Sequence, residues 1–175
     1  MRRQEKIGYG AVVVAVLLCL LGTLGYSLEG EVTDVPTPNV PNRLFFADEP
    51  LPEQTLAVFL SATVTLNWDR EDVFVAIVDE NEKKTCDVQL YSPGSTACTV
   101  FDSDVIVSSM NGEEGLVWEV EEGVYYAGIG TSSQDGLPQG TVVDLTYSVH
   151  LQAGFASYFV FALIGASGLA YTRVE

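Results

Sequence analysis

Two long apolar stretches, one near each end of the chain, dominate the pattern of hydrophobic and polar positions. The first covers residues 7–28 and the second residues 153–171, and neither contains a charged side chain. A bilayer core about 30 Å thick is crossed by roughly 20 apolar helical residues. The two stretches therefore predict two transmembrane helices.

Between these stretches the pattern changes to a period of two, which is typical of half-buried strands. In residues 55–67 the apolar side chains occupy every second position, and residues 73–78 form a short continuous apolar run. Turn signals separate further candidates: Ser92-Pro93-Gly94-Ser95 predicts one hairpin and Asn111-Gly112 another. The predicted strands are residues 55–67, 73–78, 85–91, 96–101, 105–110, 115–120, 123–130 and 141–151.

About eight short strands without an amphipathic helical window predict an all-β fold, an antiparallel β-sandwich of jelly-roll type. The sandwich is expected over residues 55–152. Residues 29–54 contain five prolines, which neither donate to a strand ladder nor continue a helix, so this segment is interpreted as a stiff linker. Leu44-Phe45-Phe46 interrupts it as an apolar island that could form a short edge strand docked onto the domain.

Charge indicates the orientation of the chain in the membrane. The flanking basic residues are Arg2, Arg3, Lys6 and Arg173, and basic residues beside a span stay on the cytoplasmic side. Residues 1–6 and 172–175 are thus expected in the cytoplasm, and the centre outside the cell membrane. The first span also fits a signal peptide, since a basic start precedes it and Gly25 and Ser27 are small residues at a cleavage-compatible spacing.

The predicted outer segment is strongly acidic. Residues 28–153 hold 22 acidic and four basic residues, a net charge of −18. Nucleic acid and anionic headgroups are poor partners for such a surface, because each phosphate contact requires a Lys or Arg. Solubility is the simplest explanation of the acidity, and calcium binding is the alternative.

Acidic turns supply the calcium candidates, because calcium takes six to eight oxygen ligands that loops at one end of a sandwich can provide. No EF-hand pattern occurs, and no other cofactor is predicted. The candidate ligands are Asp69, Asp72, Asp79, Glu80, Asp102 and Asp104.

Three cysteines are present. Cys19 lies within the first span, whereas Cys86 and Cys98 lie in the predicted outer domain, where an oxidising compartment favours a disulfide between them. A tight turn at Pro93-Gly94 would place Cys86 opposite Phe101, so a disulfide requires a wider loop.

Motifs of catalysis are missing from the sequence: it has no Gly-x-Ser-x-Gly elbow, His-Glu-x-x-His helix or phosphate-binding glycine loop. Its one histidine, His150, is expected close to the lipid headgroups rather than in a catalytic triad. The sequence therefore predicts a protein that is not an enzyme, with no catalytic residues. Of Trp68 and Trp118, one is expected in the core; the other, if exposed, would suit glycan binding.

Small residues recur every fourth position in both spans, which places them on one face of each helix. Such faces let helices approach closely in lipid, so the spans are expected to pair with each other or with a partner's helices. The predicted packing residues are Ala11, Ala15, Cys19 and Thr23 in the first span and Ala162, Ala166 and Ala170, supported by Gly165 and Gly168, in the second.

Residues 118–126, Trp-Glu-Val-Glu-Glu-Gly-Val-Tyr-Tyr, with the later strand 141–151, resemble the terminal strands of GOLD-type and pre-peptidase-C-type jelly-roll domains. In those domains a Gly-x-Tyr-Tyr strand is followed by a return strand. GOLD-domain cargo receptors also place a small sandwich with a cysteine pair before a membrane span. This chain lacks their coiled-coil stretch and the sorting pairs of their tails, so cargo transport is not carried over. The resemblance implies a jelly roll that binds rather than catalyses.

These features together predict a membrane-anchored outer β-sandwich that mediates protein contacts, as an interaction module or as an accessory subunit of a membrane assembly. Its expected partners are membrane lipid and either a protein partner or further copies of the chain. The alternative is a surface module that binds calcium or a glycan.

Overall fold

The structure, a computed structural model, describes residues 3–51, 58–86, 98–99 and 104–173. They divide into two compact units. The helix unit contains residues 3–27, 58–62 and 150–173, and the sheet unit contains the other described residues. The helices are α1 (Arg3–Leu24), α2 (Glu80–Cys86) and α3 (Phe155–Thr172), and the strands are β1 (Tyr26–Pro36), β2 (Leu44–Phe46), β3 (Leu60–Trp68), β4 (Val73–Asp79), β5 (Val107–Ser109), β6 (Leu116–Val120), β7 (Tyr125–Thr131) and β8 (Val142–Ala153).

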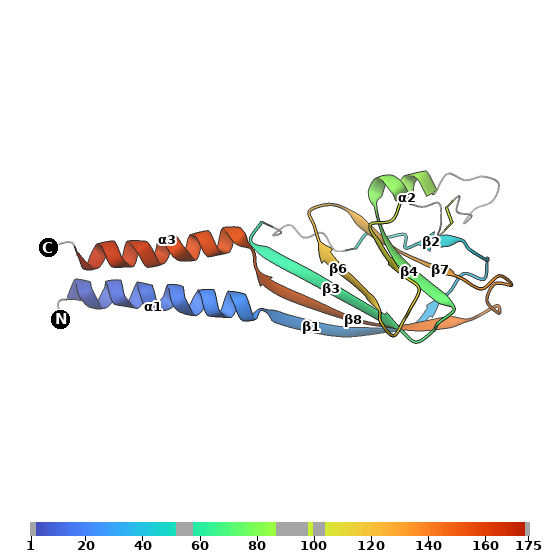
Figure 1. The fold of residues 1–175 in the computed structure, drawn as a ribbon, viewed down its shortest axis with the longest axis horizontal. Coiled ribbons are helices and arrows are strands. Elements are labelled where there is room, and N and C mark those ends of the chain that lie inside the picture. Colours follow the sequence, from blue (N-terminus) through green and yellow to red (C-terminus); the bar gives the residue numbers. More distant parts are fainter. Residues whose placement is uncertain (1–2, 52–57, 87–97, 100–103, 174–175) are drawn as a thin grey trace. The chain divides into compact units, whose positions relative to one another are not determined.

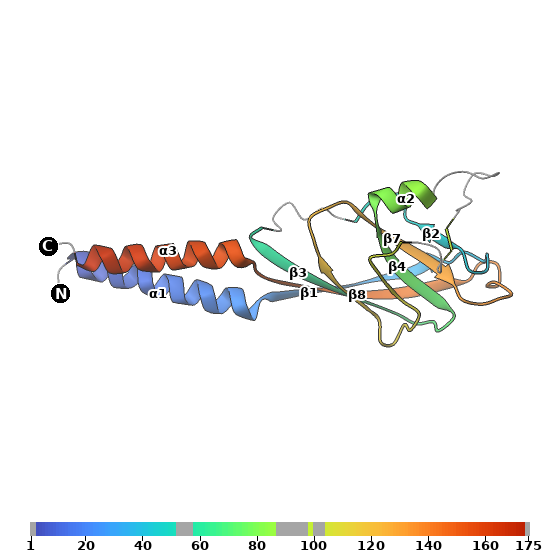
Figure 2. The same cartoon turned by 45° about the horizontal axis from the view of Figure 1, so that its top comes forward.

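In the helix unit α1 and α3 lie side by side and antiparallel (Figures 1 and 2). Both are long and apolar enough to cross a membrane, over Glu5–Leu24 and Phe155–Thr172. At 1.5 Å per residue these segments measure about 30 and 27 Å, close to the thickness of a bilayer core.

The ends of the first apolar stretch differ from the prediction. The helix stops at Leu24, because Gly25 adopts a left-handed conformation (φ 69°) and its N–H bonds to the carbonyl oxygen of Leu21. A glycine in this conformation commonly ends a helix. The apolar residues Tyr26 and Leu28, predicted within the span, consequently begin β1.

The strands form two four-stranded sheets, with the orders β1-β8-β3-β6 and β2-β7-β4-β5, and they confirm the predicted antiparallel β-sandwich. In the second sheet β7 pairs with both β2 and β4. The continuous apolar run of β4 is buried from Val73 through Val78, as expected for a central strand. The predicted strand at residues 55–67 is shorter in the structure, where β3 begins at Leu60 after a turn at Val58 and Phe59.

The segment predicted as a linker contributes two strands, of which the one at residues 44–46 agrees with the edge strand considered there and the other was not predicted. Residues 29–36 belong to β1 and residues 44–46 are β2, and each is the outermost named strand of its sheet in the described chain. Proline is tolerated on edge strands because one side of such a strand needs no hydrogen bonds. Pro36, accordingly, is the last residue of β1.

Asn111-Gly112 does not close a hairpin. The strands on either side of it, β5 and β6, lie in different sheets. The Asn111 side chain accepts the backbone N–H groups of Glu113 and Glu114, and Gly115 takes the left-handed conformation (φ 71°). The connection is therefore a wider turn that passes from one sheet to the other.

Helix α2 was missed by the sequence reasoning, which assigned Thr85 and Cys86 to a strand. The Asp79 carboxylate accepts the N–H of Glu82 and caps the helix, and Lys84 pairs with Glu80 one turn away. This cap followed by an acidic third residue is a helix-start signal. The rest of the predicted hairpin, residues 87–97 and 100–101, lies outside the described residues.

The core of the sheet unit is dense on one side of the sandwich. It includes both tryptophans: Trp68 and Trp118 are each less than 10% exposed, and Trp118 contacts Tyr125 edge to face. Both tryptophans, and not just one, therefore belong to the core, and neither is an exposed ring of the kind that would suit glycan binding. The apolar faces of β3 and β6 carry both rings inward, since Trp68 and Trp118 fall at buried alternate positions.

Candidate functional site

The helix contact uses small residues, as predicted: Ala11 and Ala15 in α1, and in α3 the supporting residues Gly165 and Gly168. Ala15 is buried, and a Cβ atom on Gly165 would lie 3.4 Å from the Ala15 Cβ. A Cβ on Gly168 would lie 2.9 Å from that of Ala11. Ala11 and Cys19 are partly buried, while Thr23 is exposed.

In α3 the predicted face is wrong. Ala162, Ala166 and Ala170 are exposed, and the contact runs through Gly165 and Gly168. Small residues occupy two different faces of this helix, and spacing alone does not choose between them. Glycine allows the closer backbone approach, because it has no Cβ atom.

Polar side chains link the ends of the two helices and the adjoining strands. Thr23 shares a hydrogen bond with Tyr158 (3.1 Å), and Gln152 donates to the Thr23 carbonyl oxygen (3.2 Å). The only histidine, His150, is 2.8 Å from the Ser27 hydroxyl through its Nδ1 atom. All of these residues belong to the helix unit.

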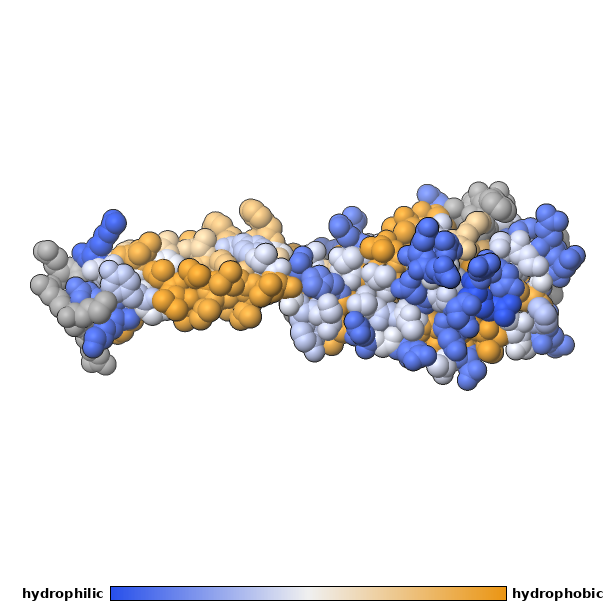
Figure 3. Space-filling view, turned by 60° about the horizontal axis from the view of Figure 1, so that its bottom comes forward, coloured by the Kyte–Doolittle hydropathy of each residue, from blue (hydrophilic) through white to orange (hydrophobic). Residues whose placement is uncertain are grey.

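Much of the helix surface that is visible in Figure 3 is apolar. Leu21 and Leu24 of α1 and Phe155 and Phe159 of α3 are each more than 60% exposed. Large exposed apolar areas are rare in water. The surface is therefore suited to contact with lipid.

The structure contains the predicted disulfide. Cys86 and Cys98 are bonded and buried. The Glu82 Oε1 atom lies 3.6 and 3.7 Å from their sulfur atoms and accepts the N–H of Asp104 (3.0 Å). In the described part of the chain, these three side chains form a group of acidic, cysteine or histidine ligand atoms close enough for a metal ion. With both sulfurs bonded to each other, the thiolate ligands that zinc requires are not available.

Of the calcium candidates, Asp79 and Asp104 line one small pocket beside α2, of about 250 Å³. Asp69 accepts the N–H of Asp144, Asp79 caps α2, and Glu80 pairs with Lys84. Asp104 contacts Glu82 through its backbone, and Asp102 lies outside the described residues. The carboxylates of Asp69, Asp79 and Glu80 thus each have a partner in the protein.

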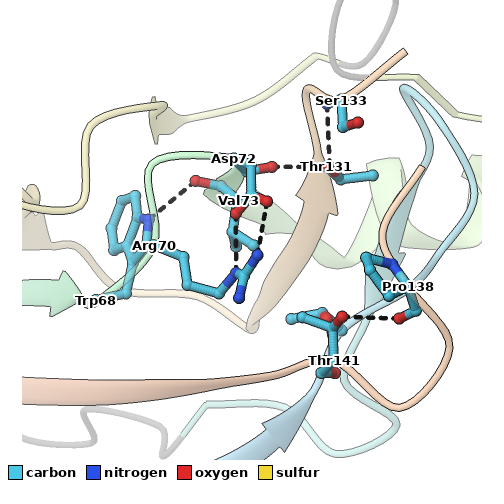
Figure 4. A network of polar contacts seen from close by, with 9 residues as sticks. Trp68, Arg70, Asp72, Val73, Thr131, Ser133, Pro138 and Thr141 are labelled. Carbon is cyan, nitrogen blue, oxygen red and sulfur yellow. Dashed lines mark hydrogen bonds and ion pairs between the residues drawn. The ribbon is translucent and has the colours of Figure 1, made fainter. Parts of the chain in front are cut away.

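Asp72 is held in a polar network at the turn between β3 and β4 (Figure 4). Arg70 donates two hydrogen bonds to its carboxylate, at 2.8 and 2.7 Å, and these bonds lower the pKa of Asp72 and raise that of Arg70. The Thr131 hydroxyl donates to the Asp72 carbonyl oxygen, and the Trp68 indole donates to that of Val73. The network ties β3, β4 and β7 together and is structural in character.

The sheet unit contains an apolar groove with a volume of about 840 Å³. Ligand sites typically measure about 300–1,000 Å³ and are lined mostly by apolar side chains. We name it the β1/β2 groove because it lies between these edge strands. Its lining is Val32, Val35 and Pro36 of β1, residues 37–40, Phe45 and Phe46 of β2, Ala47, Asp48, Leu66, Val75, residues 127–129 and Leu145.

The floor of the groove consists of side chains that point between the sheets. Leu66, Leu145 and Ile129 hold such positions but are only partly buried, whereas Val75 beneath them is fully enclosed. At the rim, Val32 is 48% and Val40 42% exposed. The sandwich is thus packed on the side of the tryptophans and accessible on the side of β1 and β2.

Acidic residues follow β1 and one lines the groove. Glu29, Glu31 and Asp34 are exposed along β1, and Glu29 and Glu31 line a separate pocket with Tyr147. Asp48 is the one charged side chain among the described residues that line the groove. The groove is thus apolar with a single carboxylate, and further carboxylates lie along the neighbouring strand.

The sequence did not predict this groove, because β1 was assigned to a linker and only Leu44-Phe45-Phe46 was considered as a short edge strand. Further signals were present in β1, where Val32 and Val35 are apolar positions among polar residues. These apolar positions indicate side chains that face inward, but they do not predict that a groove is left between the two sheets.

Comparison with known proteins identifies no relative from which a function can be carried over. No family model matches the chain, and no curated protein matches it. Among solved structures, the SPBc2 prophage-derived protein YomS aligns with 73% of this chain and 96% of its own length, at 14% identity and a TM-score of 0.27. A score this low carries no argument about fold or function.

Proposed function

We propose that the protein is a membrane-anchored, non-catalytic interaction module, a jelly roll outside the cytoplasmic membrane that binds a protein partner through the β1/β2 groove. One observation carries the proposal: the groove has an apolar, partly exposed floor beside an edge strand. Interfaces are built around such apolar centres with polar borders. An accessory subunit of a membrane assembly is the form of this role that we favour.

Two further features support the proposal. The strand neighbours β1-β8, β3-β6, β2-β7 and β4-β5 are those expected of a jelly roll, in which a long double ribbon folds over into two sheets. The basic residues beside the apolar helices favour an outer location for the sheet unit and cytoplasmic ends. The resemblance to GOLD-type domains agrees with a binding role.

Photocrosslinking in native membranes tests this function. A benzoylphenylalanine residue at Val32, on the groove rim, is expected to give a protein adduct of defined mass. The matched control is Val142, which is 41% exposed at the start of β8 and outside the groove lining. Adducts at both positions, or at neither, would contradict the proposal.

A second variant checks that the groove itself is responsible. Ala127 lies on the groove floor and pairs with Ile77 across β4 and β7. Ala127→Leu adds apolar volume there, so the fold is expected to remain and the Val32 adduct to be lost. Persistence of the adduct in this variant would place the contact elsewhere.

A further inference from the structure

We propose that the groove binds its partner by strand addition: an extended segment with alternating apolar and basic residues pairs with the open edge of β1 and inserts its apolar side chains into the groove. This inference rests on the proposed function and names the chemistry of the partner. Three properties of the sheet unit lead to it, and they concern the backbone, the side-chain spacing and the charge.

The backbone of β1 is available on one side. The strand order places β8 on its inner side and no named strand of the described chain on its outer side. On the inner side, Thr37 following β1 donates to the Thr141 carbonyl oxygen. An edge strand presents a row of N–H and C=O groups that another extended chain can pair with.

The groove runs beside this edge. Val32 and Val35 of β1 line it together with Phe45 and Phe46 of β2, the last named strand of the other sheet. A strand added next to β1 would direct every second side chain between the two sheets. Those side chains would cover Leu66, Ile129 and Leu145, which line the groove and are only partly buried.

Charge selects the partner. A strand paired with β1 would run past Glu29, Glu31 and Asp34, and its end would approach Asp48. Opposite charges in cross-strand pairs stabilise a sheet and like charges destabilise it. A basic segment is therefore favoured over a second copy of β1, which would oppose acidic rows, and over an anionic lipid.

A synthetic peptide tests the proposal on the full-length protein in nanodiscs of neutral phosphatidylcholine. The probe is a fluorescent nine-residue peptide of alternating Lys and Val, and its binding is followed by anisotropy. We expect saturable binding and slower hydrogen exchange of the β1 amides. Absence of binding at concentrations up to about 1 mM, an affinity near the weakest useful limit, would overturn strand addition.

Matched controls separate pairing from simple charge attraction. The same peptide methylated on alternate backbone nitrogens keeps its charge and side chains but loses the N–H groups of one edge, so it is expected to bind at least about tenfold more weakly. A Glu-Val peptide is expected not to bind. Equal binding of the methylated peptide would show a charge effect only and would refute the inference.

Variants of the protein locate the site. Val32→Asn is expected to weaken binding about tenfold, which corresponds to about 1.4 kcal/mol, and Val142→Asn by less than about twofold. If the Val32 photocrosslink forms in membranes but the peptide fails to bind, the proposed interaction function is retained and the inference of strand addition is wrong. If native mass spectrometry instead shows a lipid that Val32→Asn removes, the occupant is a lipid and the inference is wrong.

Discussion

Gly8 of α1 and Gly168 of α3 lie in direct backbone contact: a Cβ atom on Gly8 would come within 2.6 Å of the Gly168 carbonyl oxygen, and one on Gly168 within 2.8 Å of the Gly8 carbonyl oxygen. Close backbone approach at small residues is the main source of helix association in lipid. The pairing of the two helices therefore depends on positions where no side chain fits.

Gly8→Leu is expected to separate the helices, because its side chain would meet α3. The proximity can be measured as the disulfide yield between Ala15→Cys and Gly165→Cys in a Cys19→Ala background, since the relevant Cβ separation of 3.4 Å is near that of a disulfide. Gly10 has no neighbour within 4 Å, so Gly10→Leu is the control and leaves the yield unchanged. Equal yields in the two leucine variants would contradict the packing.

The orientation in the membrane can be tested with an impermeant maleimide on intact cells. Glu113→Cys, in the exposed turn before β6, is expected to react, and Arg173→Cys, after α3, only after permeabilisation. Both variants require Cys19→Ala. Reaction of the two positions in the reverse order would invert the proposed topology, and a mature chain beginning near residue 28 would make the first span a signal peptide.

Trp68→Phe removes the hydrogen bond from the indole to the Val73 carbonyl oxygen (2.9 Å) in a buried environment. An unsatisfied buried acceptor costs about 1–3 kcal/mol, so the free energy of unfolding in urea should fall by this amount. The exposed Tyr147→Phe serves as the control and should change it by less than about 0.5 kcal/mol. A Trp68→Phe change as small as that of the control would argue against this bond.

Replacing both Cys86 and Cys98 by Ala is expected to lower the free energy of unfolding by about 3 kcal/mol, because the disulfide closes a loop between residues 12 apart. Since both cysteines are buried, a reductant should act on the native protein slowly, and neither Cys86 nor Cys98 should react with iodoacetamide before denaturation. Rapid alkylation of these two cysteines by reductant and iodoacetamide under native conditions would show that the bond is accessible.

Acid should weaken the sheet unit partly through Asp72. Arg70 lowers the pKa of Asp72 in the folded protein below its ordinary value of 3.8. Below that value the unfolded chain binds a proton that the folded chain does not, so this contribution is present above pH 3.8 and is lost as the pH falls through the folded-state pKa.

Urea titrations at several pH values check the sign of this effect. Asp72→Asn and Arg70→Met should each show a smaller loss of stability between about pH 4 and pH 2 than the unmodified protein. Arg70→Lys keeps the charge but not the paired hydrogen bonds, so its loss of stability over this pH range should lie between that of Arg70→Met and that of the unmodified protein. Identical pH profiles for all four proteins would rule out a role for this pair.

Local patterns in the sequence were sufficient for much of the fold. Continuous apolar runs predicted α1, α3 and the buried strand β4, and alternation predicted β3 and β8. These predictions were possible because the spacing of apolar residues along the chain reflects which faces of an element are apolar. The predicted disulfide between Cys86 and Cys98 was also correct. Such features depend on residues close together in the chain.

Tertiary structure decided the features that depend on distant residues. The choice of Gly165 and Gly168 over Ala162, Ala166 and Ala170 follows from which face of α3 meets α1. Pairing with β8 and β7 makes strands of the proline-rich segment, and the β1/β2 groove exists only because two edge strands from different sheets lie across the core from each other. The sequence by itself determined which segments are apolar, extended or helical; the packing of the sheets decided which of those apolar side chains became core and which remained available to a partner.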